Sequence, residues 1–208
     1  MTSSNLLRFP TGRTFARILA DDHEWVVLTD TRLNPLVTVR SDSKNSISLK
    51  DHNIAFYQLR TKIPDGKHIR IYDLHTHPDQ NMSVISPRDL QTAIIDQIQP
   101  SNDVEVVGHG VITKDEILII KLKGTIEQKK QLLWADKDKG YEKYSNTISD
   151  VYHQRALSNI IFKPKQNKRT GLELNAHNSV LKEIVNEYPI IKLKKVKKTR
   201  RFTMTRRK

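Results

Sequence analysis

Two histidines separated by one residue stand out in the stretch YDLHTHPDQNMSVISPRDL, residues 72–90. Side chains of a strand alternate between its two faces, so His75 and His77 point the same way if they end a strand. Asp89 falls in the first turn of the helix expected next, from which its carboxylate can return to the strand end. Two imidazoles and one carboxylate leave a fourth tetrahedral position open for water, as in catalytic zinc sites, and zinc lowers the pKa of that water to about 7.

Such a site also needs a base to take a proton from the water, and glutamate often has that role. Residues 1–104 contain a single glutamate, Glu24. It opens an apolar stretch that starts at Trp25, so a solvated strand end is the simpler interpretation of Glu24 taken alone. The order of this glutamate, the histidine pair and the later Ser-x-x-Asp favours the catalytic interpretation.

Each part of this pattern also has an ordinary explanation. A lone His-x-His at a strand end is more often structural than metal-binding, and Ser86 alone would be a helix N-cap worth about 1 kcal/mol. The joint order and spacing, together with Pro78, favour a metal site over these separate explanations. We interpret His109 as structural, and no partner spacing supports a role for His23, His52, His68, His153 or His177.

The whole pattern resembles the JAMM (JAB/MPN+) motif of metal-dependent isopeptidases, which reads Glu…His-x-His-Pro…Ser-x-x-Asp. Within that superfamily the chain is most similar to the RadC-like JAB branch, on the segments HEWVVLTDTRLNPL and VEVVGHGVITKDEILII. The resemblance covers residues 15–123, a little over half of the chain. The chain reads HTHPDQ where RadC proteins usually read His-Asn-His-Pro-Ser-Gly, and it has no room for the helix-hairpin-helix module of long RadC proteins.

The resemblance implies a role for each matching residue. His75, His77 and Asp89 would bind Zn²⁺. Glu24 would hold and deprotonate the metal's water and then protonate the leaving amine, while Ser86 would donate a hydrogen bond to the oxyanion. The implied activity is that of a zinc metallopeptidase, a hydrolase that cleaves an amide or isopeptide bond in a protein or peptide substrate. The implied fold is the MPN/JAB fold of the deaminase-like group, a mixed β-sheet flanked by helices.

Local sequence patterns predict the elements that must hold these residues. Apolar and β-branched runs bounded by turn formers predict strands at residues 24–30, 35–40, 46–49, 68–75, 104–112 and 116–122. A helix is expected at 51–62, capped by Asp51, and another after Ser86, with Pro87 at its first position and Asp89 at N3. Strands interspersed with helices predict an α/β or α+β domain.

After residue 123 the sequence changes from strand-like patterns to helix-like patterns with polar breaks. We expect a RadC-like JAB/MPN+ domain at 1–123, a helical extension at 124–191 and a basic, disordered tail at 192–208. Within the extension, 172–188 has the pattern of an amphipathic helix, and it follows a basic, linker-like stretch. The sequence leaves open whether these helices pack on the first domain.

The net charge of +13 is concentrated at the C-terminus. Residues 192–208 hold ten Lys or Arg and no acidic residue, so the rest of the chain carries only +3. Such a block can neutralise phosphates on nucleic acid, or it can be a solubilising tail. The alternative function is therefore a nucleic-acid-associated JAB scaffold protein, by analogy with DNA repair, anchored through Lys194, Lys195, Lys197, Lys198, Arg200 and Arg201.

Composition excludes several classes of protein. The chain has no cysteine, which rules out disulfides, thiolate zinc fingers and the cysteine-ligated zinc of deaminases. No apolar run reaches the length of about 18 residues that predicts a membrane span, and the N-terminus lacks the apolar core of a signal peptide. We therefore expect a cytoplasmic protein without a membrane span.

Overall fold

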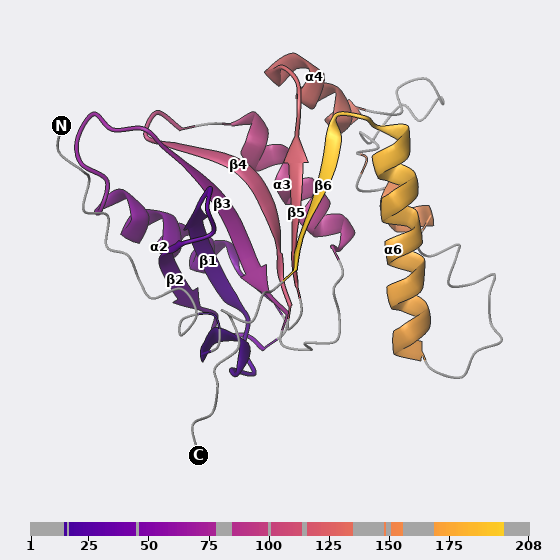
Figure 1. Cartoon of the computed structure of the whole chain (residues 1–208), viewed down its shortest axis with the longest axis horizontal. Coiled ribbons are helices and arrows are strands. Elements are labelled where there is room, and N and C mark those ends of the chain that lie inside the picture. The colour runs from indigo at the N-terminus through magenta and orange to yellow at the C-terminus, as the bar shows by residue number, and fades with distance from the viewer. Residues whose placement is uncertain are drawn as a thin grey trace.

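The computed structural model describes most of the chain, and its residues form one sheet with helices against it (Figure 1). For residues 169–177 the description covers the backbone alone. The described residues are 15, 17–44, 46–77, 85–99, 101–113, 116–134, 148, 151–155 and 169–197.

Six strands form the sheet in the order β2-β1-β3-β4-β5-β6 (Figure 1). The central pair of β3 and β4 is parallel, and the other neighbouring pairs are antiparallel. The prediction of a mixed sheet flanked by helices is thereby confirmed. The strands are β1 (Trp25–Asp30), β2 (Pro35–Arg40), β3 (Ile69–Thr76), β4 (Val104–Ile112), β5 (Glu116–Leu122) and β6 (Ile191–Lys197).

Helices make the longer connections between the strands. The crossover from β3 to the parallel β4 runs through α3 (Pro87–Ile98), because parallel neighbours cannot be joined by a tight turn. The others are α2 (Leu49–Arg60) before β3, α4 (Ile126–Gln131) and the 3-10 turn η1 (Leu132–Trp134) after β5, and α6 (Arg169–Glu187) before β6. Of the helices described, none combines the length and the apolar character needed to cross a membrane.

Helix α2 begins earlier than the sequence predicts. Its N-cap is Ser48 and not Asp51, so the short strand expected at 46–49 is wrong. Ser48 Oγ accepts a hydrogen bond from Asp51 N at 3.2 Å, and Ser48 N donates to Asp51 Oδ2 at 2.8 Å. This capping box satisfies amides that a helix start leaves unpaired, which is why Asp51 lies inside the first turn.

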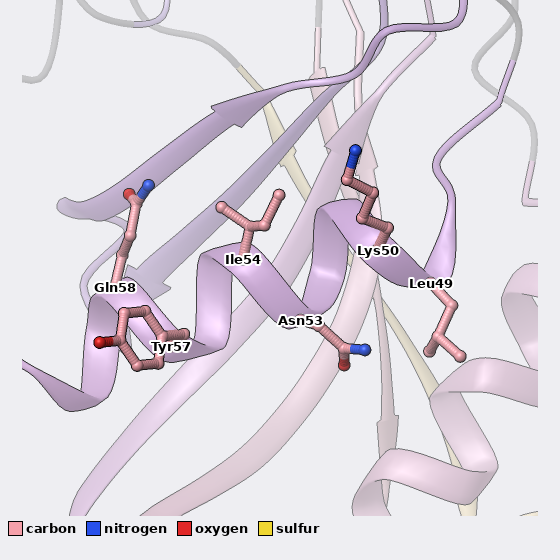
Figure 2. A pocket seen from close by; sticks show the side chains of 6 residues that line it. All are labelled: Leu49, Lys50, Asn53, Ile54, Tyr57 and Gln58. Carbon is pink, nitrogen blue, oxygen red and sulfur yellow. The ribbon is translucent and has the colours of Figure 1, made fainter.

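The outward face of α2 is partly apolar. Leu49 and Tyr57 are 76% and 70% exposed, whereas Ala55 and Leu59 are buried against the sheet. Figure 2 shows the exposed side chains around an open surface hollow lined by Leu49, Lys50, Asn53, Ile54, Tyr57 and Gln58. His52 falls on the buried side with Ala55 at helical spacing, so the hollow is separate from the buried polar residues described below.

The core lies on both faces of the sheet. One face packs against α2 and α3, and its buried apolar residues include Val26, Ile71, Val106, Val111 and Leu118. The opposite face packs against Phe15 and Ile18, and it includes Val27, Tyr72, Leu74, Ile112 and Ile119. Strand alternation from Ile71 therefore places Asp73 and His75 on the face that the two helices cover.

One extra residue in β4 changes which way its side chains point. The register of β3 against β4 shifts between Ile71 and Tyr72, which leaves Val107 as the extra residue of β4. A bulge of this kind reverses the alternation beyond it, so His109 faces α2 and α3. His109 pairs across the ladder with Asp73, and both side chains are buried on the same face.

The described residues after 123 pack on the same core as the strands. Val180 and Ile184 of α6 share one buried cluster with Leu90 of α3. Tyr152 belongs to that cluster, and its hydroxyl donates a hydrogen bond to the carbonyl oxygen of Ile85 at 2.7 Å. The described parts of the helical extension therefore pack on the strand-rich domain, which the sequence left open.

Part of the predicted disordered tail is a strand. Residues 192–197 belong to β6, which pairs with β5 along its whole length, so the prediction of disorder is wrong there. The buried Ile191 anchors the strand, and Lys195 Nζ lies 2.6 Å from Glu116 Oε2 of β5. A sheet edge tolerates many lysines because their side chains extend into solvent. The rest of the predicted tail, 198–208, lies outside the described residues.

Ile191→Ala tests whether β6 belongs to the folded core. Ile191 is fully buried, so the substitution should lower the free energy of unfolding by about 2–5 kcal/mol. Lys192→Ala, at the adjacent exposed position, should change it by less than about 0.5 kcal/mol. Urea unfolding followed by circular dichroism measures both, and equal, negligible effects would contradict the strand.

Candidate metal centre

The histidine pair lies at the end of the central strand β3. His75 is 6% exposed and pairs with Val26 of β1 and Val111 of β4. His77 is half-buried and follows the last strand residue. The two Nε2 atoms lie 3.1 Å apart, so the two imidazoles converge as the His-x-His spacing predicts.

The start of helix α3 brings the third side chain to this pair. Ser86 is the N-cap, Pro87 follows it, and Asp89 occupies N3, as predicted. Asp89 Oδ2 accepts a hydrogen bond from Ser86 N at 2.7 Å, and Asp89 N donates to Ser86 Oγ at 3.2 Å. The other carboxylate oxygen, Oδ1, lies 3.3 Å from His75 Nε2. One capping box therefore both starts the helix and aims a carboxylate oxygen at the histidines.

Two of the three distances between the donor atoms match the edge of a tetrahedral metal site. His75, His77 and Asp89 each offer one ligand atom, and the three atoms lie within 4.8 Å of one another. Zinc–ligand bonds of 2.0–2.1 Å give a tetrahedral edge of about 3.3 Å. The distances of 3.1 Å between the imidazoles and 3.3 Å from imidazole to carboxylate match that edge. The residues present thus suit zinc in both chemistry and spacing.

The protonation states of these side chains also suit a metal. Burial lowers the pKa of His75 to about 3, despite the opposing effect of Asp89. Burial alone would raise the pKa of Asp89, but His75, His109 and the Ser86 amide outweigh it and lower that pKa. At neutral pH His75 is therefore neutral and Asp89 ionised, which are the forms that bind a metal.

Glu24 lies beside this centre, directly before β1. It is 7% exposed, and its backbone carbonyl accepts a hydrogen bond from Ser41 N at 2.8 Å. Strand β1 pairs Val26 with His75 in antiparallel register. Continuing this register by two residues places Glu24 opposite His77. Burial raises the pKa of Glu24 to about 7, and the charge of Asp89 adds to that effect. A carboxyl group with this pKa can exchange a proton at neutral pH.

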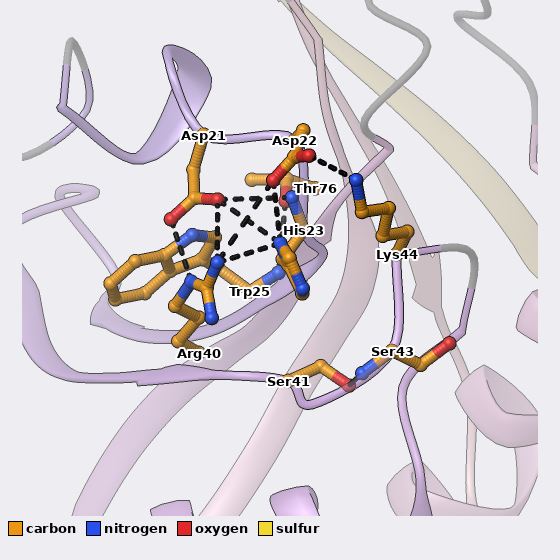
Figure 3. A network of polar contacts seen from close by, with 9 residues as sticks. All are labelled: Asp21, Asp22, His23, Trp25, Arg40, Ser41, Ser43, Lys44 and Thr76. Atoms are coloured by element: carbon orange, nitrogen blue, oxygen red, sulfur yellow. Dashed lines mark hydrogen bonds and ion pairs between the residues drawn. The ribbon is translucent and has the colours of Figure 1, made fainter.

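A network of ion pairs holds the segment before Glu24 (Figure 3). Arg40 Nε donates to Asp21 Oδ2 at 2.8 Å, and Lys44 Nζ donates to Asp22 Oδ2 at 2.5 Å. The hydrogen bond from Arg40 outweighs desolvation and lowers the pKa of Asp21 well below its ordinary value. The acidic group Asp21, Asp22 and His23 could by spacing hold a cation, but Arg40 and Lys44 already neutralise it. Its structural effect is to fix the chain on which Glu24 lies.

The structure thus brings together Glu24, His75, His77, Ser86 and Asp89. The basic residues proposed for nucleic acid lie elsewhere, in and after β6. Lys194, Lys195 and Lys197 are exposed on that strand, with Lys195 paired to Glu116 and Lys194 Nζ 5.6 Å from the centre of the Tyr72 ring. Lys198, Arg200 and Arg201 lie outside the described residues.

Sequence reasoning missed a second group of titratable side chains, two buried and two half-buried, beside this centre. Asp73 from β3, Asp96 from α3 and His109 from β4 converge, with His52 of α2 next to Asp73. The rings of His75 and His109 have centroids 5.5 Å apart. One signal was present in the sequence, because an aspartate in the apolar alternation of a core strand must face buried surroundings.

No protein-family model, curated protein or solved structure gives a significant match to this chain. The interpretation of the centre therefore rests on its own residues and their geometry.

Asp89→Asn should remove one equivalent of zinc from the protein. The amide is neutral and a weaker metal donor, so zinc affinity should fall by about tenfold or more. Asp51→Asn is the matched control, because Asp51 is the N3 residue of the other Ser-x-x-Asp capping box. Elemental mass spectrometry after zinc loading and desalting measures the loss. Equal zinc contents in the two variants would contradict the assignment of Asp89.

The buried Glu24 should make the metal-free protein less stable as the pH rises. The pKa of Glu24 is 4.5 in a solvated chain and about 7 in the folded protein, so the unfolded chain loses its proton first. The free energy of unfolding should therefore fall as the pH rises between these two values. Glu24→Gln should abolish this part of the pH dependence. Urea unfolding in the presence of a metal chelator measures the free energy of unfolding at each pH. An identical pH dependence for wild type and Glu24→Gln would show that Glu24 is not buried.

Proposed function

We propose that this chain is a zinc-dependent metallopeptidase of the JAMM type, similar to the RadC-like JAB branch, and that it hydrolyses amide or isopeptide bonds. One observation carries the proposal. His75 Nε2 lies 3.1 Å from His77 Nε2 and 3.3 Å from Asp89 Oδ1, and the donor atoms of the three residues lie within 4.8 Å of one another. The buried carboxyl of Glu24 is close enough for the charge of Asp89 to raise its pKa. Three protein ligands are typical of catalytic zinc, which keeps one position open, and structural zinc usually has four.

The fold is compatible with this proposal. A mixed sheet flanked by helices is the architecture expected of an MPN/JAB domain, and β3 and α3 carry the ligands as the motif order requires. The metal-binding histidines would sit at the end of a central strand, where its neighbours β1 and β4 hold their backbone. Sites on rigid elements keep their ligands within the narrow tolerance that metal chemistry needs.

The side chains of the centre have distinct proposed roles. Zinc, when bound, polarises the substrate carbonyl and lowers the pKa of water. The Glu24 carboxylate accepts a proton from the attacking water and returns it to the leaving amine, which its pKa of about 7 suits in both directions. Ser86 Oγ accepts from Asp89 N, and that bond leaves its own hydroxyl proton to be donated to the developing oxyanion.

The closely matched serines Ser86 and Ser48 allow catalysis to be separated from helix capping. Ser86→Ala and Ser48→Ala each remove an N-cap hydroxyl, so each should cost about 1 kcal/mol of stability. Only Ser86→Ala should lower kcat, by about 10²–10³, because only that hydroxyl reaches the oxyanion.

The assay uses zinc-loaded protein and a panel of fluorogenic peptides and lysine-linked isopeptides, followed on the member cleaved fastest. Urea unfolding gives the stability of both variants. Equal losses of kcat in the two variants would mean that Ser86 is only a cap. Cleavage that persists after removal of the metal, or that Glu24→Gln leaves unchanged, would contradict the proposed mechanism.

A further inference from the structure

The second group of titratable side chains lies between the sheet and helices α2 and α3. Asp73 and His109 are 1% and 2% exposed and pair across the β3–β4 ladder. His109 Nδ1 lies 3.7 Å from Asp73 Oδ2 and 3.9 Å from Asp96 Oδ2. His52 Nδ1 lies 3.2 Å from Asp73 Oδ2. Four side chains from four elements thus meet around one carboxylate.

Three buried polar atoms of this group lack the hydrogen bonds that burial normally demands. Both carboxylate oxygens of Asp73 and Nδ1 of His109 are buried and make no hydrogen bond of good geometry with the described residues. A carboxylate removed from water costs several kcal/mol unless a partner compensates it. Burial of Asp73 opposes its charge, but the imidazoles of His109 and His52 outweigh burial and lower its pKa, so its carboxylate is ionised. An ionised carboxylate and an imidazole nitrogen that converge in this way are suited to share a cation.

The charges around the group point to a cation. The other acidic group, at Asp21 and Asp22, has Arg40 and Lys44 as counter-ions. Within the described part of the chain, the ion pairs of Asp73 and Asp96 are with histidines alone. Burial raises the pKa of Asp96 to about 6, and the charge of Asp73 adds to this, so the two carboxylates repel each other.

We propose that Asp73, Asp96 and His109 bind a second divalent transition-metal ion, of which zinc is the representative, next to the first centre. Each of the three residues offers one ligand atom, and these atoms lie within 4.8 Å of one another. One imidazole and two carboxylates suit zinc and its neighbours in the first transition row. His52 would act as the outer partner that holds the Asp73 carboxylate.

The donor spacing implies a small contraction when the metal binds. The distances of 3.7 and 3.9 Å exceed the tetrahedral edge of the first centre. Closing them to about 3.3 Å requires movements of about half an ångström, which side-chain rotation can supply. Asp96 comes from α3, the helix that also carries Asp89, so the second ion would tie this helix to β3 and β4 behind the first ligands.

A proton is the competing occupant of the group. Burial opposes a charge on His109, but Asp73 outweighs burial and raises the pKa of His109. An imidazolium at His109 would compensate one carboxylate without any metal, and a count of bound zinc separates the two cases.

The test counts zinc in the full-length chain by elemental mass spectrometry after loading with zinc sulfate and desalting. Wild type should retain about two ions, and the double variant His75→Ala/His77→Ala should retain about one. Asp96→Asn should also retain about one, because Asp96 is a donor of the second site alone. Asp22→Asn, in the neutralised acidic group, should keep the wild-type content.

The outcomes separate this inference from the proposed function. The wild type could hold one zinc ion that is lost in His75→Ala/His77→Ala and retained in Asp96→Asn. That result would overturn the second site and leave a proton on His109. A single ion that only Asp96→Asn removes would support the second site and overturn the zinc peptidase. Near-ultraviolet circular dichroism checks the fold of each variant. If Asp96→Asn does not fold, the zinc content of His75→Ala/His77→Ala tests the second site: about one ion supports it, and none overturns it.

Discussion

The parallel pairing of β3 with β4 is the constraint on which the rest of the site depends. A parallel pair needs a crossover, and α3 provides it, so the helix start returns to the end of β3 where His75 lies. The capping box at Ser86 then fixes the carboxylate of Asp89 toward the imidazoles. The same pairing sets His109 against Asp73, and the bulge in β4 turns that histidine toward the helices. Topology and local capping together place every candidate ligand.

The electrostatic cost of this arrangement explains its chemistry. Several ionisable side chains lie on the buried face of the sheet, where water cannot compensate their charges. Burial keeps His75 neutral and raises the pKa of Glu24, which are the states that the proposed metal binding and proton exchange require. Structural ion pairs also perturb pKa values, but the groups at this strand end also bring three possible ligand atoms within 4.8 Å of one another. Buried charges are costly where their pairing is incomplete, and a bound cation would offset that cost.

Sequence patterns predict the elements well where one signal dominates. The strands at 104–112 and 116–122 have the expected bounds because apolar runs end at clear turn formers, and the Ser-Pro-x-Asp start of α3 is a strong cap. The start of α2 was missed although Ser48 begins the same capping pattern, because short apolar runs do not distinguish a strand from a helix start. In β6 the lysines hid the apolar residues Ile191, Leu193 and Val196, which pack on the sheet core. The side of the sheet on which His109 lies depends on a bulge in β4. A bulge reverses the alternation of side chains, and no residue type in the local sequence predicted it.

The most direct test of this account is a crystal structure of the zinc-loaded protein with diffraction data collected on both sides of the zinc absorption edge. The account predicts an anomalous difference peak about 2.0–2.2 Å from each of His75 Nε2, His77 Nε2 and Asp89 Oδ1. A map without a peak between these atoms, in crystals saturated with zinc and with the imidazole nitrogens still 3.1 Å apart, would contradict it. The end of β3 and the capped start of α3 would then have no role in metal chemistry.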